Sequence, residues 1–326
     1  MSRTWESNRI RAVTRCSFVG GGAEMGQTSQ DYDVVEEIGT GSYGIVYKAR
    51  DQVSGLVVAL KQIRVQGSAS GVPATTFREI GLLKRLCRLR CQLVVKLLNV
   101  ITTPLPENSD IQITLVFEHV EQDLASFISS FPPPCLPDEL VKSIEFKILK
   151  GLDFLHSNRI VHRDLKPQNV LVSDRGQVVK LADFGLSRMY SSNSVLTTVV
   201  VTLWYRAPEV LLNAAYATPV DIWSAACIFA ELASRTALLQ GNTELEQLRK
   251  IFRLLGSPAE EAWPQSSSIP WRSFSGEAGV PLSTAVPNLT GNGQDLLREM
   301  LRFDPTQRIT AQDSVNHVYF EGMSLP

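Results

Sequence analysis

The chain has 326 residues, of which 44% are hydrophobic and 20% are charged, and its 32 basic and 33 acidic side chains nearly cancel. A chain of this length is too long for one compact core, so two lobes are expected. The balanced charge gives no indication of binding to nucleic acid or to a membrane surface, and no apolar run is long enough to span a bilayer.

Residues 1–31 are expected to form a disordered N-terminal extension. The first 30 residues contain four arginines and no sustained apolar stretch, which excludes a secretory signal and leaves a transit peptide as the alternative. The cysteines are scattered, at Cys16, Cys87, Cys91, Cys135 and Cys227. Because Cys87 and Cys91 lack a second pair at metal-ligand spacing, buried thiols in a reducing compartment are expected.

From residue 32 to about 118 the sequence alternates as in strands, with one helix inserted. Three strand-like stretches, DVVEEIGTG, YGIVYKAR and LVVALKQIR, are joined by short turns. A helix is predicted at about 73–89, since Pro73 suits a first turn. This helix is weakly specified, because it begins with poor helix formers and has Gly81 in its middle. Strands are predicted again in VVKLLNVIT and QITLVFEHV.

From residue 121 onward the pattern becomes helical. SIEFKILKGLDFLHSNRI has apolar residues at helical spacing, and VDIWSAACIFAEL is apolar on almost every side, which predicts a buried helix. We therefore expect a strand-rich lobe over 32–118 and a helical lobe over 123–320, joined near 118–123 and followed by a short tail at 321–326.

Three glycines, Gly39, Gly41 and Gly44, lie between two predicted strands in IGTGSYGIV. In a dinucleotide fold the glycine pattern opens a helix, whereas a position between strands favours a flap whose backbone covers phosphates. Glycines that only permit tight turns are the alternative.

Lys61 ends the otherwise apolar run Ala-Leu-Lys in a predicted strand. A buried, unpaired ammonium is unfavourable, so Lys61 needs an anionic partner. Glu79, eighteen residues further on in the predicted helix, is the candidate, with ATP phosphates as the second one. A lysine exposed at a sheet edge is the alternative.

The stretch VHRDLKPQN at 161–169 is followed by DFG at 183–185. Phosphoryl transfer needs a group that orients the hydroxyl, positive charge near the phosphates, and oxygen atoms that hold Mg²⁺. Asp164 fits the first role, Lys166 the second, and Asn169 and Asp183 the third. Each fragment alone is compatible with a surface loop, but their order and spacing together are typical of protein kinases.

Over about residues 32–320 the sequence resembles the eukaryotic protein kinases, which implies a bilobal α+β fold and ATP and Mg²⁺ as cofactors. Further family features are APE at 207–209, Asp221 before Ile-Trp, and Arg308 in DPTQR. The resemblance implies that Glu209 and Arg308 pair. Lys166 in HRDLKPQN resembles the serine/threonine branch.

Three further stretches resemble the cyclin-dependent kinases. PATTFRE at 73–79 is similar to their cyclin-docking helix, LTTVVVTLWYRAPE at 196–209 to their activation segment, and FEHVEQDL at 117–124 to the subgroup partnered by D-type cyclins. The resemblance implies a cyclin on residues 73–86 and retinoblastoma-like substrates phosphorylated at Ser/Thr-Pro sites. It also implies an activating kinase, ankyrin-repeat inhibitors, no nucleic acid or membrane partner, and a location in the nucleus and cytoplasm.

The same resemblance implies regulatory and substrate-binding residues. Arg78, Arg163 and Arg188 would converge on a phosphate at Thr197, because clustered guanidiniums chelate a phosphate; unrelated surface ion pairs are the alternative. Val201 and Thr202 would line the pocket for the substrate proline. Ser42 and Tyr43 are candidate inhibitory phosphosites, with ordinary turn residues as the alternative.

The resemblance also implies a set of ATP-binding residues, in which Glu118 and Val120 offer backbone groups to the adenine. The set consists of Ile38, Gly39, Gly41, Gly44, Val46, Ala59, Lys61, Phe117, Glu118, Val120, Asp123, Asn169 and Asp183.

Two classes of function remain open. An active cyclin-dependent serine/threonine kinase is favoured, because Lys61, Glu79, Asp164, Asn169 and Asp183 are all present. The alternative is a catalytically weak scaffold or cyclin-sequestering protein. Among enzymes, a stress- or mitogen-activated kinase is the nearest rival, but it would show Thr-x-Tyr in the activation segment.

Overall fold

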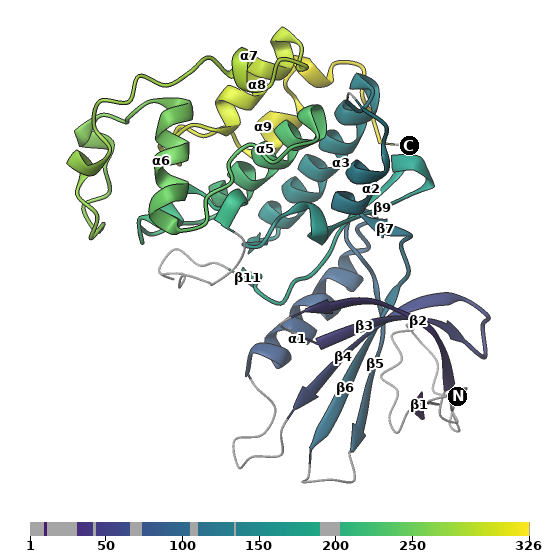
Figure 1. The fold of residues 1–326 in the computed structure, drawn as a ribbon. Helices are drawn as coiled ribbons and strands as arrows, with labels where there is room; N and C mark the ends of the chain where they lie inside the picture. Colours follow the sequence, from purple (N-terminus) through teal and green to yellow (C-terminus); the bar gives the residue numbers. More distant parts are fainter. Residues whose placement is uncertain are drawn as a thin grey trace, which may run out of the picture. The chain divides into compact units, whose positions relative to one another are not determined.

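The computed structural model describes residues 10–11, 31–41, 44–65, 74–104, 110–133, 135–189 and 203–325. The chain divides into two compact units, Met1–Val120 and Glu121–Pro326. This division falls within the stretch 118–123 that the sequence predicts as the joint. Figure 1 shows that strands dominate the first unit and helices the second.

The first unit is built on an antiparallel sheet with the strand order β1-β2-β3-β4-β6-β5. The sequence predicts β2 to β6 and the helix α1, and all of them are present. β1 is a two-residue strand in the stretch expected to be disordered; the other residues before 31 lie outside the described part. The bounds are β1 Ile10–Arg11, β2 Asp31–Gly41, β3 Gly44–Asp51, β4 Val57–Val65, α1 Ala74–Leu89, β5 Leu97–Pro104 and β6 Ile111–Glu118.

The two faces of this sheet carry different side chains. Side chains alternate between the faces of a strand, so directly paired neighbours share a face. The register pairs Val46 with Lys61 and Ala59 with Phe117, which places these four on one face. A hydrophobic cluster lies on the other face and consists of Tyr32, Ala49, Val58, Leu60, Ile101 and Val116.

The second unit is organised around α3 and α5, which pack against each other. In α5, 13 of 16 residues are buried, so the predicted helix that is apolar on almost every side is confirmed. The described residues of this unit form the α-helices α2 Leu124–Ser130, α3 Asp138–Ser157, α4 Pro208–Leu211, α5 Pro219–Ser234, α6 Glu244–Leu255, α7 Leu282–Ala285, α8 Gly291–Met300 and α9 Ala311–Val315.

The second unit is mainly helical, as the sequence predicts from residue 121 onward, and it also contains short strands that the sequence pattern does not show. One sheet has the order β10-β9-β7, and another pairs β11 with β8. Strands of two to four residues are too short to show a period and form through tertiary pairing. Their bounds are β7 Gln122–Asp123, β8 Ile160–Val161, β9 Val170–Ser173, β10 Val178–Leu181 and β11 Arg188–Met189.

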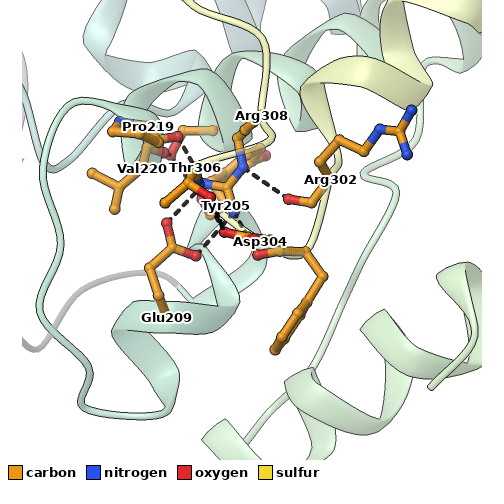
Figure 2. A network of polar contacts seen from close by, with 10 residues as sticks. Tyr205, Glu209, Pro219, Val220, Arg302, Asp304, Thr306 and Arg308 are labelled. Atoms are coloured by element: carbon orange, nitrogen blue, oxygen red, sulfur yellow. Dashed lines mark hydrogen bonds and ion pairs between the residues drawn. The ribbon is translucent and has the colours of Figure 1, made fainter. Parts of the chain in front are cut away.

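A buried ion pair ties α4 to the segment after α8, as the resemblance implies. Nη1 and Nη2 of Arg308 donate to the two carboxylate oxygens of Glu209 at 2.7 and 3.0 Å. Figure 2 shows that the same guanidinium also donates to the carbonyl oxygens of Pro219 and Arg302. Its carbon lies 5.2 Å from the centre of the Trp223 ring. Such a pair is tolerated in a core because its remaining hydrogens also find acceptors.

None of the four cysteines in the described residues forms a disulfide. Cys227 is buried, but Cys87, Cys91 and Cys135 are half-buried, so the expectation of buried thiols is wrong for these three. They lie near the end of α1 or in turns, where packing covers only one side. Cys16 lies outside the described residues.

Across the described ranges, no helix combines the length and the apolar character that crossing a bilayer requires.

Candidate active site

The first unit contributes a buried ion pair. Nζ of Lys61 on β4 lies 3.0 Å from Oε1 of Glu79 on α1, and the two side chains are 12% and 6% exposed. The contact predicted from the sequence is therefore present, and the alternative of an exposed edge lysine is wrong. The carboxylate of Glu79 holds the ammonium on the sheet face that Lys61 shares with Val46 and Ala59.

The helix α1 is held by one buried side rather than by intrinsic propensity. Leu82, Leu83 and Leu86 are buried, whereas Phe77 on the other side is 61% exposed. A Cβ at Gly81 would meet no atom within 4 Å, so packing does not require a glycine there. Packing of an amphipathic face therefore carries most of the stability of this helix.

The glycine-rich stretch forms the end of β2 and the start of β3, the strand–turn–strand setting predicted from the sequence. Gly39 pairs with Val46, and Gly41 pairs with Gly44. Gly44 has a φ of +130°, and a Cβ there would collide with the carbonyl oxygen of Gln62, so only glycine fits. At Gly39 the nearest atom would be 4.0 Å away. Backbone geometry thus explains Gly44 but not Gly39.

Glu118 ends β6, where the resemblance implies contacts with adenine. Its N–H donates to the carbonyl oxygen of Lys96 at 3.0 Å, and its carboxylate accepts the N–H of Lys96 at 2.8 Å. The N–H of Glu118 is thus engaged within the first unit, so a role in adenine binding would fall to its carbonyl oxygen and to the backbone of Val120. Among the apolar members of the predicted set, Ile38 is exposed, and Val46, Ala59, Phe117 and Val120 are half-buried.

Asp123 is the N-cap of α2. Its carboxylate accepts the backbone N–H of Ser126 at 3.0 Å and the hydroxyl of Ser126 at 2.7 Å. Capping of this kind accounts for an aspartate at this position. Its implied role in ATP binding stays a prediction.

The second unit contributes the loop between β8 and β9. Oδ2 of Asp164 accepts from Nζ of Lys166 at 3.1 Å and from Nδ2 of Asn169 at 3.0 Å. Nδ2 of Asn169 also donates to the backbone carbonyl of Asp164 at 2.7 Å. The structure therefore brings three of the predicted residues together. With the amide hydrogens of Asn169 turned toward Asp164, its Oδ1 is left as the acceptor.

Asp221, at the start of α5, anchors the backbone of this loop. Its carboxylate accepts the N–H groups of His162 and Arg163 at 2.8 and 2.9 Å, and lies 2.9 Å from Nε2 of His156. Burial acts to raise the pKa of Asp221, but the hydrogen bond and charge of His156, together with the N–H of Arg163, hold it below its ordinary value. Arg163 is thereby kept at a φ of +73°. Sequence reasoning identified Asp221 as a family feature but missed this anchoring.

Asp183 follows β10 and lies beside Asn169. The N–H of Ala182 donates to the carbonyl oxygen of Asn169 at 2.9 Å, and Nε2 of His162 donates to the carbonyl oxygen of Ala182 at 3.0 Å. Phe184 is buried with its ring centre 5.1 Å from that of His162. The residue before Asp183 is therefore hydrogen-bonded to the backbone of Asn169, the other predicted magnesium ligand.

The donor atoms of this pair suit Mg²⁺. In the described residues no group of three or more His, Cys, Asp or Glu side chains forms a metal cluster. Mg²⁺ does not require such a cage, because it keeps several waters and binds one or two carboxylates together with substrate phosphates. The carboxylate of Asp183 and the amide oxygen of Asn169 are the hard oxygen donors that this ion prefers.

A cavity of the second unit opens beside Asp164. Arg206 and Tyr216 line this cavity, and sequence reasoning did not identify either as a site residue. No motif marks Tyr216, because its place in the cavity depends on contacts with distant parts of the chain. Nη1 of Arg206 donates to Glu244 on α6 at 3.1 Å. The lining residues are Arg163, Asp164, Leu165, Lys166, Tyr205, Arg206, Ala207, Val210, Tyr216, Val220 and Ser224.

Several predicted site residues lie outside the described part of the chain: Ser42, Tyr43, Thr197, Val201 and Thr202. Arg188 is described only through its backbone in β11, and Arg78 is exposed on α1 of the first unit. The convergence of Arg78, Arg163 and Arg188 on Thr197 therefore stays a prediction.

Comparison with known proteins gives two results. The family model for the protein kinase domain matches residues 32–320. Cyclin-dependent kinase 4 of Xenopus laevis is 53% identical over 289 residues, which cover 89% of this chain and 90% of that protein. Cyclin-dependent kinase 4 of Rattus norvegicus and that of Mus musculus are each 52% identical over 291 residues, which cover 88% of this chain and 95% of each of those proteins.

Proposed function

The chain belongs to the protein kinase family, and from that premise we propose that it is a cyclin-dependent serine/threonine kinase that promotes cell-cycle progression. The observation that carries the proposal is the catalytic loop, in which the Asp164 carboxylate contacts both Lys166 and Asn169. The name shared by the similar relatives, cyclin-dependent kinase 4, supports dependence on a cyclin.

In the proposed reaction, the hydroxyl oxygen of a substrate serine or threonine forms a bond to the γ-phosphorus of ATP as the bond to ADP breaks. Asp164 orients this hydroxyl and accepts its proton. The contacts with Lys166 and Asn169 fix the direction of the carboxylate, and Lys166 adds positive charge next to the reacting groups. Position and charge are the main contributions that phosphoryl transfer requires of a protein.

Asn169 and Asp183 are the residues that would hold Mg²⁺, through one amide and one carboxylate oxygen. When bound, the ion neutralises charge on the phosphates of ATP. The chain's own contribution is to hold together the backbones that carry the two donors, through the hydrogen bond from Ala182 to the Asn169 carbonyl.

Lys61 would contact the phosphates of ATP, and the glycine stretch would cover them. The buried carboxylate of Glu79 holds Lys61 in place, so the position of α1 sets the position of the ammonium. A partner that stabilises α1 would therefore regulate ATP binding.

The proposed partner on residues 73–86 is a D-type cyclin. The exposed side of α1, with Phe77 61% exposed, supports docking of a protein at this helix. Phosphorylation of Thr197 by an activating kinase, ankyrin-repeat inhibitors, and retinoblastoma-like substrates with Ser/Thr-Pro sites complete the proposal, as does a location in the nucleus and cytoplasm.

A kinase assay of the purified chain with and without a D-type cyclin tests this function, using a Ser-Pro peptide and a matched Ser-Ala peptide. We expect activity on the Ser-Pro peptide only in the cyclin complex, after an activating kinase has phosphorylated Thr197 in every sample. Asp164→Asn should reduce that activity by about 10²- to 10⁴-fold, the usual contribution of a general base. Full activity of the lone chain would contradict cyclin dependence, and inactivity with every cyclin would favour the scaffold alternative.

A further inference from the structure

Tyr216 lines the cavity beside Asp164. The guanidinium carbon of Arg163 is 5.6 Å from the centre of the Tyr216 ring, and both residues line the cavity together with Arg206. Burial lowers the pKa of Arg206, whereas the charges of Glu244 and Asp164 act in the opposite direction. Tyr216 thus meets Arg163 with its ring and shares the cavity with Arg206.

Arg163 connects the catalytic loop to the loop that carries Asp183. Its Nη1 donates to the carbonyl oxygen of Leu186, three residues after Asp183, at 3.2 Å. The next residue is tied to the same place, because the hydroxyl of Ser187 donates to the carbonyl oxygen of His162 at 3.0 Å. The position of the Asp183 carboxylate therefore depends in part on where the Arg163 side chain is held.

A long arginine side chain has many rotamers, so each contact along it narrows the positions that its guanidinium can take. A planar guanidinium also stacks on an aromatic face, and such a contact gains strength where water is excluded. Tyr216 is half-buried and presents its ring to Arg163. The ring therefore adds to the hydrogen bond with Leu186 a contact that confines Arg163.

We propose that Tyr216 is a positioning residue: its ring holds Arg163 against the carbonyl of Leu186 and thereby keeps Asp183 in place beside Asn169 for magnesium binding. This inference rests on the proposed function, because it takes Asp183 and Asn169 as the residues that hold Mg²⁺.

The test measures ADP binding to the full chain by calorimetry, once with Mg²⁺ and once with EDTA. The ratio of the two affinities within one variant separates the contribution of the metal from general changes in the protein. We expect the wild type and Tyr216→Phe, which keeps the ring, to show the same ratio. Tyr216→Leu should reduce the ratio about threefold to tenfold, the range of a partly desolvated cation–ring contact.

A second pair of variants tests the route through Arg163. Arg163→Gln alone should reproduce the loss, and Tyr216→Leu should add nothing in that background, since one contact cannot be removed twice. Thermal unfolding of each variant confirms that it is folded. If Tyr216→Leu fails to fold, the ratio of ADP affinities in Arg163→Gln, compared with that of the wild type, still tests the inference.

Three results would overturn the inference while leaving the proposed function standing. They are an unchanged ratio in Tyr216→Leu or Arg163→Gln, a loss in Tyr216→Phe as large as in Tyr216→Leu, and an additive loss in the double variant. Equal ADP affinities with Mg²⁺ and with EDTA in the wild type would instead contradict the assignment of Asp183 and Asn169, and both proposals would fall together.

Discussion

At the scale of single residues, Glu145 on α3 occupies an environment poorly suited to a carboxylate. It is fully buried, and neither carboxylate oxygen has a hydrogen-bond partner within the described residues. Burial raises its pKa well above the ordinary 4.5. The folded protein therefore favours the neutral acid, whereas the unfolded chain exposes a carboxyl that ionises in the usual range.

Glu145 makes the stability of the protein depend on pH. The folded state retains the proton above pH 4.5 while the unfolded state releases it, so the free energy of unfolding falls as the pH rises from 4.5 toward the raised pKa. Glu145→Gln removes the ionisation, so relative to the wild type the variant should gain about 1.4 kcal/mol of stability for each pH unit above 4.5, up to the raised pKa of Glu145. Urea unfolding of both proteins between pH 4 and pH 8 measures this difference.

The matched control is Glu139→Gln, an exposed position on the same helix. It should leave the free energy of unfolding within about 0.5 kcal/mol at every pH, as surface substitutions usually do. A constant difference between Glu145→Gln and the wild type across the pH range would contradict the ionisation argument.

Among the helices and strands, length decides how much the sequence alone predicts. α3 and α5 have 20 and 16 residues, enough for an apolar period to show, and both are predicted. β7 and β8 have two residues each and exist because a distant strand pairs with them, so no local pattern marks them. α1 lies between these cases, because its intrinsic helix propensity is poor and the packing of its buried leucines stabilises it.

Gly81 tests whether the weakness of α1 has a function. A Cβ at this position meets no atom within 4 Å, so Gly81→Ala should stabilise the helix by about 0.5–1 kcal/mol. If a loose α1 keeps the lone chain inactive, this gain should raise the activity without cyclin by about twofold to fivefold, following the stability increment. A peptide kinase assay of the lone chain measures this activity.

Gly291→Ala in the first turn of α8 is the control, because its Cβ also meets nothing within 4 Å. It should raise thermal stability without changing activity in the absence of cyclin. Equal activities of the two variants would show that α1 does not limit the lone chain.

For the whole molecule, the sequence predicts the candidate site residues better than it predicts the tertiary contacts that position them. The spacing of Lys61 and Glu79 indicates an ion pair that the structure contains. The family resemblance selects Asp164, Asn169 and Asp183, whose contacts are then visible in the second unit. The anchoring of the loop by Asp221 arises from tertiary contacts between residues nearly 60 positions apart, which no local pattern encodes.

The distribution of burial predicts where backbone amides exchange slowly with solvent. In α5, 13 of 16 residues are buried, so its amides should exchange only through opening of much of the second unit. β2 has exposed side chains from residue 33 to 38, and α1 has one exposed side, so both should exchange faster. Hydrogen–deuterium exchange followed by mass spectrometry measures these rates for each segment.

Addition of a D-type cyclin should slow exchange in α1 and leave α5 unchanged. The proposed docking surface, residues 73–86, includes most of α1, whereas α5 is already protected by its own unit. Protection confined to segments outside 73–89 would place the partner elsewhere and contradict the docking proposal. Phe77→Ala provides the sharper form of the test: Phe77 is 61% exposed, so its loss leaves the fold intact, and protection of α1 by cyclin should weaken only if that side chain is buried in the complex.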